Sequence, residues 1–159
     1  MKAAVLTVSD GVSEGTREDR SGDLLAELLQ GEGYKVERRL VPDDAAAITE
    51  ALAELVEDAR LVLTTGGTGL GPRDVTPEAT REVIERDAPG IAQALRADSI
   101  AKTPHGLLSR GLAGVRGSTL IVNLPGSTGG CRDGFAVLQP ALGHALELLM
   151  GEPTAHKQT

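Results

Sequence analysis

Apolar residues in this chain occur in short continuous runs, and between the runs they recur every three or four positions. A continuous apolar run of four to eight residues is typical of a strand that is buried on both faces of a sheet. We therefore expect strands over residues 3–8, 61–65 and 119–123. Residues 35–41 alternate weakly between apolar and polar side chains and predict a further strand.

The segments between these runs have the periodicity of amphipathic helices. Leucines from Leu24 to Leu29 recur at helical spacing, and Gly31 or Gly33 supplies the stop. Pro140 cannot lie in a straight helix interior and predicts either one kinked helix or two consecutive ones over 132–150. The remaining helices are expected to follow Pro42-Asp43-Asp44 and to cover residues 77–87 and 90–100. Residues 107–117 predict a less regular, bent ribbon.

Strands that alternate with helices predict a fold of the α/β class, in which helices cover both faces of a mostly parallel sheet. We therefore expect a three-layer αβα sandwich. The length of 159 residues favours one domain over residues 1–150, followed by a mobile tail over 151–159 that has no apolar pattern.

Composition narrows the functional classes. The formal net charge is −7, and Tyr34 and Phe135 are the only aromatic residues, so we expect no nucleic-acid partner. No apolar run is long enough to span a membrane, and we find no signal peptide; we therefore expect a cytoplasmic protein. Cys131 is the only cysteine, so neither an intrachain disulfide nor a cysteine zinc cluster is expected.

Ligands of parallel sheets bind at the carboxyl ends of the strands. In this sequence each of the four strand ends leads into a loop that carries glycine, hydroxyl or carboxylate groups. The loops begin with Ser9-Asp10-Gly11, Pro42-Asp43-Asp44, Thr65 to Asp74, and Pro125 to Gly130. This coincidence predicts one shared site.

The loop after residues 61–65 contains Gly66, Gly67, Gly69 and Gly71, interleaved with threonines. So many glycines indicate a backbone that approaches a ligand closely, although a long mobile loop is the alternative. The next helix is expected to have Thr76 as N-cap and Pro77 at its first position.

Two common nucleotide motifs are excluded by Pro72. A dinucleotide fingerprint beginning at Gly67 would need glycine at that position, and a phosphate loop beginning at Gly66 would need lysine there.

Two aspartates are candidates for catalysis and for metal binding. Asp43 or Asp44 is expected to cap the helix that follows, which by itself would explain one of these carboxylates. Asp74 precedes the predicted cap Thr76 by two residues and so has no routine structural role. Asp43 and Asp74 beside amides that suit phosphate would form a Mg²⁺-nucleotide site. Arg73 is either a phosphate-screening cation or an ordinary surface arginine.

Other polar residues of these loops have a structural alternative. Ser9, Asp10, Gly15 and Asp19 are candidates for nucleotide binding, with turn and cap chemistry equally able to explain them. The segment Pro125 to Gly130 resembles a second anion cradle before a helix, since a plain turn would not need so many small residues.

Catalysis by Cys131 is not expected, because no histidine is placed beside it by any motif. The spread of His105, His144 and His156 along the chain likewise predicts no metal cluster.

The segment Thr64-Thr-Gly-Gly-Thr-Gly-Leu-Gly-Pro-Arg-Asp-Val-Thr-Pro77 closely resembles the signature of the MogA/MoaB family of molybdenum cofactor biosynthesis proteins. The G domains of gephyrin and of its plant counterpart are similar. The resemblance extends over almost the whole chain, up to about Gly151. It includes Val8-Ser-Asp10, Val41-Pro-Asp43, Thr103-Pro104, Leu108-Ser-Arg110 and Gly117 to Gly126.

The resemblance implies a molybdopterin adenylyltransferase, which transfers AMP from ATP to molybdopterin with Mg²⁺ and releases pyrophosphate. It places the two essential aspartates on Asp43 and Asp74. It implies a homo-oligomer, trimeric or in some members hexameric, and a downstream molybdate-insertion protein as partner. The implied substrate-binding residues are Thr65, Gly66, Gly67, Thr68, Gly69, Ser109, Arg110, Pro125, Gly126 and Ser127. Two alternatives stay open: a non-catalytic molybdopterin-binding or assembly protein of the MoaB type, and another nucleotide-dependent transferase or hydrolase.

Overall fold

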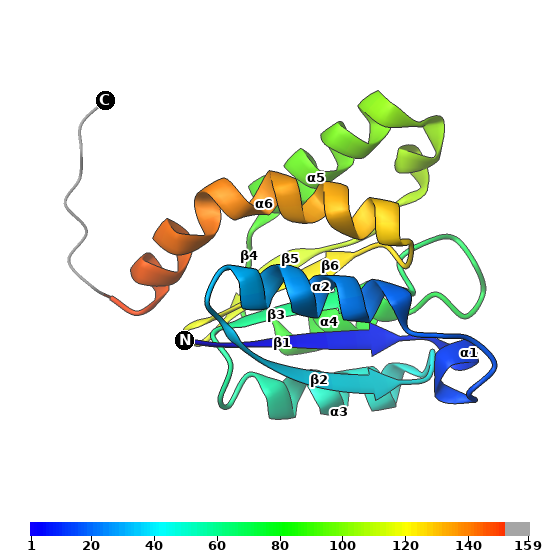
Figure 1. Ribbon diagram of the computed structural model, residues 1–159, viewed down its shortest axis with the longest axis horizontal. Helices are drawn as coiled ribbons and strands as arrows, with labels where there is room; N and C mark the ends of the chain where they lie inside the picture. The colour runs from blue at the N-terminus through cyan, green and yellow to red at the C-terminus, as the bar shows by residue number, and fades with distance from the viewer. Residues whose placement is uncertain (152–159) are drawn as a thin grey trace.

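A computed structural model describes residues 1–151 of the chain (Figure 1). Its centre is a six-stranded sheet in the order β2–β1–β3–β6–β5–β4. Strands β2, β1, β3 and β6 run parallel, whereas β5 is antiparallel to β6 and β4 is antiparallel to β5. The strands are β1 (Lys2–Val8), β2 (Lys35–Val41), β3 (Leu61–Thr65), β4 (Arg86–Asp87), β5 (Ala113–Arg116) and β6 (Thr119–Leu124). The predicted mostly parallel sheet of an α/β fold is therefore confirmed.

Helices cover both faces of the sheet. Successive strand residues point to opposite faces, so in β1 Ala3 and Val5 belong to one hydrophobic core and Ala4 and Leu6 to the other. The first core packs under α2 (Arg20–Gly31), α5 (Pro89–Lys102) and α6 (Thr128–Leu149), and the second under α3 (Ala45–Leu55) and α4 (Thr76–Val83). Figure 1 shows α2 and α6 side by side on one face, with α3 and α4 on the other.

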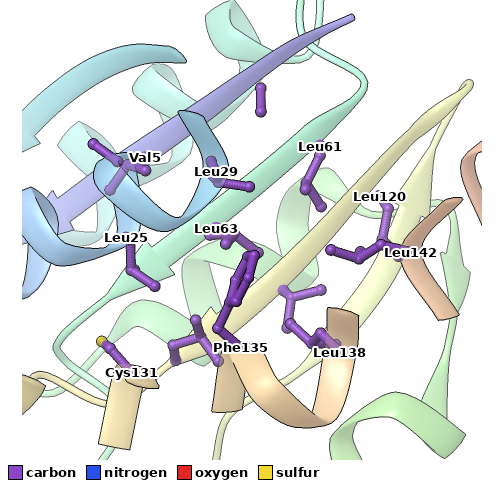
Figure 2. Packing of buried hydrophobic residues seen from close by; sticks show 14 of the residues in the cluster. Val5, Leu25, Leu29, Leu61, Leu63, Leu120, Cys131, Phe135, Leu138 and Leu142 are labelled. Atoms are coloured by element: carbon purple, nitrogen blue, oxygen red, sulfur yellow. The ribbon is translucent and has the colours of Figure 1, made fainter. Parts of the chain in front are cut away.

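The core beneath α2 and α6 joins these two helices to the sheet (Figure 2). Leucines from α2 and the aromatic ring of Phe135 from α6 lie over the side chains of β1, β3 and β6. Leu25, Leu29, Leu61 and Leu63 are fully buried there. Burial of one such side chain stabilises the fold by about 1.5–3 kcal/mol, so this layer contributes much of the stability of the sheet.

Two predicted elements differ in the structure, and for a third the structure decides between two alternatives. The helix expected over 77–87 is α4, which ends at Val83, because the N–H of Glu85 bonds the carbonyl of Val115 and the chain continues into β4. The ribbon expected over 107–117 is the end of the 3₁₀ helix η1 (Pro104–Leu108) followed by β5. Of the two alternatives for 132–150, the structure has the single helix: α6 begins at Thr128, contains Pro140 and ends at Leu149. Apolar burial on both sides of Pro140 keeps this helix in one piece.

The predicted tail over 151–159 lies, from residue 152 onward, outside the described residues. Within residues 1–151, none of the helices has the length and apolar character that a membrane crossing requires.

Candidate active site

The loops that follow β1, β2, β3 and β6 open onto one cavity of about 840 Å³ at the carboxyl edge of the sheet. Its position is the one expected for a ligand site in a parallel sheet. The structure brings residues as distant in sequence as Ser9 and Ser127 together around this space. The predicted site residues that line it are Ser9, Asp19, Asp43, Thr65, Gly66, Gly67, Thr68, Gly69, Asp74, Gly126 and Ser127.

The loop after β3 begins with two glycines that no other residue could replace without strain. Gly66 has φ +101° and Gly67 has φ +69°, a region that side chains with a Cβ avoid. A Cβ on Gly66 would lie 2.2 Å from the carbonyl oxygen of Val8, and one on Gly67 would lie 2.3 Å from Thr76 Oγ1. The close approach of β1 and α4 therefore requires glycine at both positions.

Thr76 holds the carbonyls of these two glycines. Its hydroxyl donates to the carbonyl of Gly66 (2.9 Å), and its N–H donates to the carbonyl of Gly67 (3.1 Å). The prediction that Thr76 is the N-cap of α4 is therefore wrong: Val75 occupies the cap position without a side-chain bond, and Thr76 is a buried residue of the first turn. The hydroxyl of Thr76 bonds the carbonyl of Gly66, ten positions earlier, and is therefore not used as a local cap.

Arg110 holds the next two carbonyls. Its backbone N–H donates to the carbonyl of Thr68 (2.9 Å), and its Nε donates to that of Gly69 (2.8 Å). In contrast, the N–H groups of Gly67, Thr68 and Gly69 have no hydrogen-bond acceptor among residues 1–151. With its carbonyls bonded elsewhere, the loop presents uncommitted donors at the cavity, which is the arrangement that binds phosphate oxygens.

Asp43 and Asp74 flank this loop. Asp44 is the N-cap of α3 and accepts from the N–H of Ala47 (2.9 Å), so capping explains Asp44 and leaves Asp43 free for another role. Asp43 Oδ1 lies 3.2 Å from where a Cβ on Gly67 would be, and Asp74 Oδ2 lies 3.0 Å from the same point on Gly69. Burial raises the pKa of Asp43. The hydrogen bond from the N–H of Asp10 lowers this pKa, and the negative charges of Asp10 and Asp74 raise it.

Each of these aspartates has one oxygen in a structural bond. Asp43 Oδ2 accepts from the N–H of Asp10 (2.9 Å), and Asp74 Oδ2 accepts from that of Gly71 (2.9 Å). The expectation that Asp74 has no structural role is therefore wrong. The Oδ1 atoms of both residues have no hydrogen-bond donor within the described part of the chain, which leaves one carboxylate oxygen of each for a ligand.

Asp10 and Arg73 form a clamp behind Asp43. Arg73 donates to Asp10 through Nε (2.6 Å) and Nη2 (3.1 Å), and also to the carbonyl of Asp43 (3.1 Å). Asp10 in turn accepts from the N–H of Asp43 (3.0 Å). The hydrogen bonds from Arg73, followed by that from Asp43, lower the pKa of Asp10. Asp10 does not line the cavity; it joins three strand-end loops.

The other candidates for nucleotide binding have clear local roles. Ser9 is the N-cap of the short helix α1 (Asp10–Ser13) and accepts from the N–H of Val12 (3.2 Å). Asp19 is the N-cap of α2 and also accepts from Thr7 Oγ1 (2.8 Å), yet both caps line the cavity. Gly15, with φ +77°, lies in an exposed turn and does not line it. Ser127 lines the cavity as the N-cap of α6.

The chain is similar over most of its length to a known protein family. Residues 4–144 match the family described as "Probable molybdopterin binding domain". The chain belongs to the MogA/MoaB family of molybdenum cofactor biosynthesis. This match confirms the resemblance that the sequence motifs predicted.

The similar proteins include one named MoaB and others named molybdopterin adenylyltransferase. The structure of the molybdopterin biosynthesis enzyme MoaB from Thermus thermophilus shares 46% identity, with a TM-score of 0.88, over 96% of this chain and 98% of that one. The molybdopterin adenylyltransferase of Helicobacter pylori (strain J99) is 36% identical over 92% of this chain and 86% of its own length. The Drosophila melanogaster molybdenum cofactor synthesis protein cinnamon is 39% identical over 98% of this chain, which spans only 26% of that protein.

A second cavity of about 420 Å³ adjoins the first in this MogA/MoaB chain. It lies between α5, η1 and α6 and contains the predicted residues Ser109 and Pro125. Thr68, Gly69 and Ser127 line both cavities, so the glycine loop forms the boundary between them. Arg110 lines neither cavity.

Several lining residues were not predicted from the sequence. Arg17, Glu18 and Arg20 line the first cavity, and Asn123 and Thr103 line the second. The charged residues lie in a polar stretch with no motif, so no local signal marks them. Thr103 and Asn123 lie in segments that resemble the MogA/MoaB family, and this resemblance could have marked them as site residues.

Cys131 is a packing residue at the base of the site. Its thiol is fully buried and donates to the carbonyl of Pro125 (3.1 Å) beside Thr65 Oγ1 (3.4 Å); Figure 2 shows it at the edge of the core. Burial raises its pKa from 9.0 to about 11. A low-pKa thiolate is the reactive form of cysteine, so this thiol is an unreactive one at neutral pH.

The raised pKa of Cys131 makes stability depend on pH in the alkaline range. Between pH 9 and pH 11 the unfolded thiol loses its proton while the folded one keeps it. Unfolding then releases a proton, so the free energy of unfolding should fall by about 2–3 kcal/mol over this window. Urea denaturation of the wild type and of Cys131→Ala at pH 8, 9, 10 and 11 measures this. The alanine variant should lack that part of the decline, and parallel curves would contradict the prediction.

Proposed function

We propose that this chain is a molybdopterin adenylyltransferase. A phosphate oxygen of molybdopterin attacks the α-phosphorus of ATP, the new P–O bond forms, and the bond to the β-phosphate breaks with its electron pair leaving on pyrophosphate. The observation that carries the proposal is the row of uncommitted N–H groups at Gly67, Thr68 and Gly69, placed between two carboxylates. The proposal is supported by the 36% sequence identity with a relative named molybdopterin adenylyltransferase.

The two adjoining cavities suit two substrates. The larger one, at the strand ends, has the size of a nucleotide site, and the smaller one leads away from it under α5 and η1. Substrates bound in the two cavities would have their phosphates meet at Thr68 and Gly69, which line both. Holding two reactants in this way accounts for a large share of catalysis in phosphoryl transfer.

The protein's own groups contribute by stabilising the negative charge of the phosphates. Molybdopterin phosphate already has an anionic oxygen, so no strong general base is required. The N–H groups of residues 67–69 would bond the phosphate oxygens on which negative charge develops, in a loop already fixed by Thr76 and Arg110. Because the loop is ordered before substrate arrives, little reorganisation is needed during the reaction.

The donor set fits a magnesium ion that arrives with the nucleotide. Asp43 and Asp74 each offer an uncommitted Oδ1, and Mg²⁺ is usually bound by one or two carboxylates together with phosphates and water. Within residues 1–151 no group of three or more His, Cys, Asp or Glu could hold a metal by itself. When bound, Mg²⁺ would neutralise charge on the phosphates, and Asp43 and Asp74 would hold it. Homotrimer formation and transfer of the product to a molybdate-insertion protein belong to the same proposal.

Incubation of the purified protein with molybdopterin and Mg-ATP tests the proposal. We expect pyrophosphate release and incorporation of AMP into molybdopterin, with neither product when molybdopterin is omitted. Binding of molybdopterin without pyrophosphate release would instead indicate a non-catalytic MoaB-type binding protein. Nucleotide turnover without molybdopterin would indicate a different transferase or hydrolase.

A further inference from the structure

Arg110 bonds the glycine loop and the backbone of Asp74, although it lines neither cavity. We propose that Arg110, held by Glu78, is a positioning residue that keeps the loop amides and Asp74 in place for phosphate, and does not itself bind substrate. This inference rests on the proposed function, since it names how that phosphate site is kept in shape.

The guanidinium of Arg110 is occupied by three acceptors of the protein. Nε donates to the carbonyl of Gly69 (2.8 Å), Nη2 donates to the carbonyl of Asp74 (2.8 Å), and Nη1 donates to the carboxylate of Glu78. The planar guanidinium presents its donors from three separate nitrogens in a fixed geometry, whereas the three donors of lysine all lie on one nitrogen and cannot span these spread acceptors. Each nitrogen of the guanidinium is thus bonded to the protein itself.

These bonds join the two ends of the loop tip. The segment Leu70 to Arg73 is exposed. Its backbone bond is local, from the N–H of Asp74 to the carbonyl of Gly71 (3.0 Å), and the side chain of Arg73 ties it to Asp10 and Asp43. Arg110 connects Thr68 and Gly69 on one side of the tip with Asp74 on the other. Without it, the carbonyls of Gly69 and Asp74 would lose the side chain that holds them to each other, and the adjacent amides and carboxylate would be less well fixed.

Glu78 completes the arrangement from the first turn of α4. It lines neither cavity, and the hydrogen bond from Arg110 lowers its pKa. If Arg110 bound substrate directly, loss of Glu78 would release the guanidinium and leave binding intact or improved. If Arg110 is a positioning residue, loss of Glu78 must weaken binding, although Glu78 does not reach the substrate.

The test compares Arg110→Lys, Glu78→Gln and the double variant, with ADP in the absence of metal as the probe. We expect Arg110→Lys to weaken ADP binding about 10-fold or more by calorimetry, Glu78→Gln to weaken it less, and the double variant to be no worse than Arg110→Lys. In the ligand-free protein, ¹⁵N relaxation should show increased motion at Gly67, Thr68 and Gly69 in the same order.

Arg116→Lys is the matched control. Like Arg110, Arg116 bridges a carboxylate, Glu85 (3.3 Å), and a carbonyl, Val83 (3.3 Å), and lines neither cavity. Unlike Arg110, it does not bond the glycine loop. It should leave loop motion and ADP affinity unchanged. Wild-type loop motion and ADP affinity in Glu78→Gln, with binding lost in Arg110→Lys, would overturn the inference and make Arg110 a direct ligand. If the wild type bound neither ADP nor Mg-ATP, the proposed function would fail, while the relaxation data would still decide the role of Arg110.

Discussion

Asp74→Asn should fold normally, keep its affinity for molybdopterin and lose turnover by about 10²–10³. The amide oxygen of asparagine can still accept from the N–H of Gly71, so the local turn is preserved. What it removes is the negative charge beside the glycine loop, on which the proposed Mg-nucleotide complex depends. Steady-state pyrophosphate release, together with a molybdopterin binding titration, measures the two effects separately.

Asp44→Asn is the control for that variant. Asp44 is exposed and caps α3, and asparagine is an equally good N-cap. Turnover and stability should therefore match the wild type. Wild-type turnover in Asp74→Asn would remove the metal and catalytic role from that residue, whereas a loss in both variants would indicate a general sensitivity to charge.

Gly66→Ala should destabilise the fold by about 2–5 kcal/mol. The methyl group would lie 2.2 Å from the carbonyl oxygen of Val8, which belongs to the backbone of β1 and cannot move aside. The φ of +101° adds the cost of a conformation that alanine avoids. Urea denaturation at pH 7 measures the difference, which should appear as a lower midpoint with an unchanged slope.

Gly143→Ala gives the opposite expectation for the same substitution. Gly143 lies in α6 with no heavy atom within 4 Å of its would-be Cβ. Alanine there should stabilise the protein by about 0.5–1 kcal/mol through helix propensity alone. If Gly66→Ala were as harmless as this control, the loop backbone would have to follow a different path from the one described.

Capping shows where local sequence reasoning succeeds and fails in this chain. Asp44 and Asp19, for which a capping role was among the interpretations, do cap the helices that follow them, since a cap bonds an N–H only two or three residues away. Thr76 has the sequence position of a cap but donates to the carbonyl of Gly66, ten positions earlier. Thr76 therefore stabilises the glycine loop and does not cap its own helix, and no local sequence pattern distinguishes these two roles of a threonine.

The predicted site residues divide along the same line. Asp43 and the loop from Thr65 to Gly69 were predicted from their place after strands, and they do line the cavity. Arg110 carried a substrate-binding expectation from the family resemblance, and its bonds in the structure are with the carbonyls of the loop from Thr68 to Asp74 and with Glu78. Asp10, for which nucleotide binding and local turn chemistry were both open, forms the clamp with Arg73.

By itself the sequence determined the parallel strands, the glycines at their ends and membership of the MogA/MoaB family. These features depend on apolar periodicity, on backbone conformations open only to glycine and on motifs read along the chain. The tertiary structure alone decided that α4 stops at Val83, that β4 and β5 pair, and that Thr76 and Arg110 bond the carbonyls of the glycine loop. The physical reason is that these hydrogen bonds join residues distant in sequence, so their partners exist only once the sheet has formed.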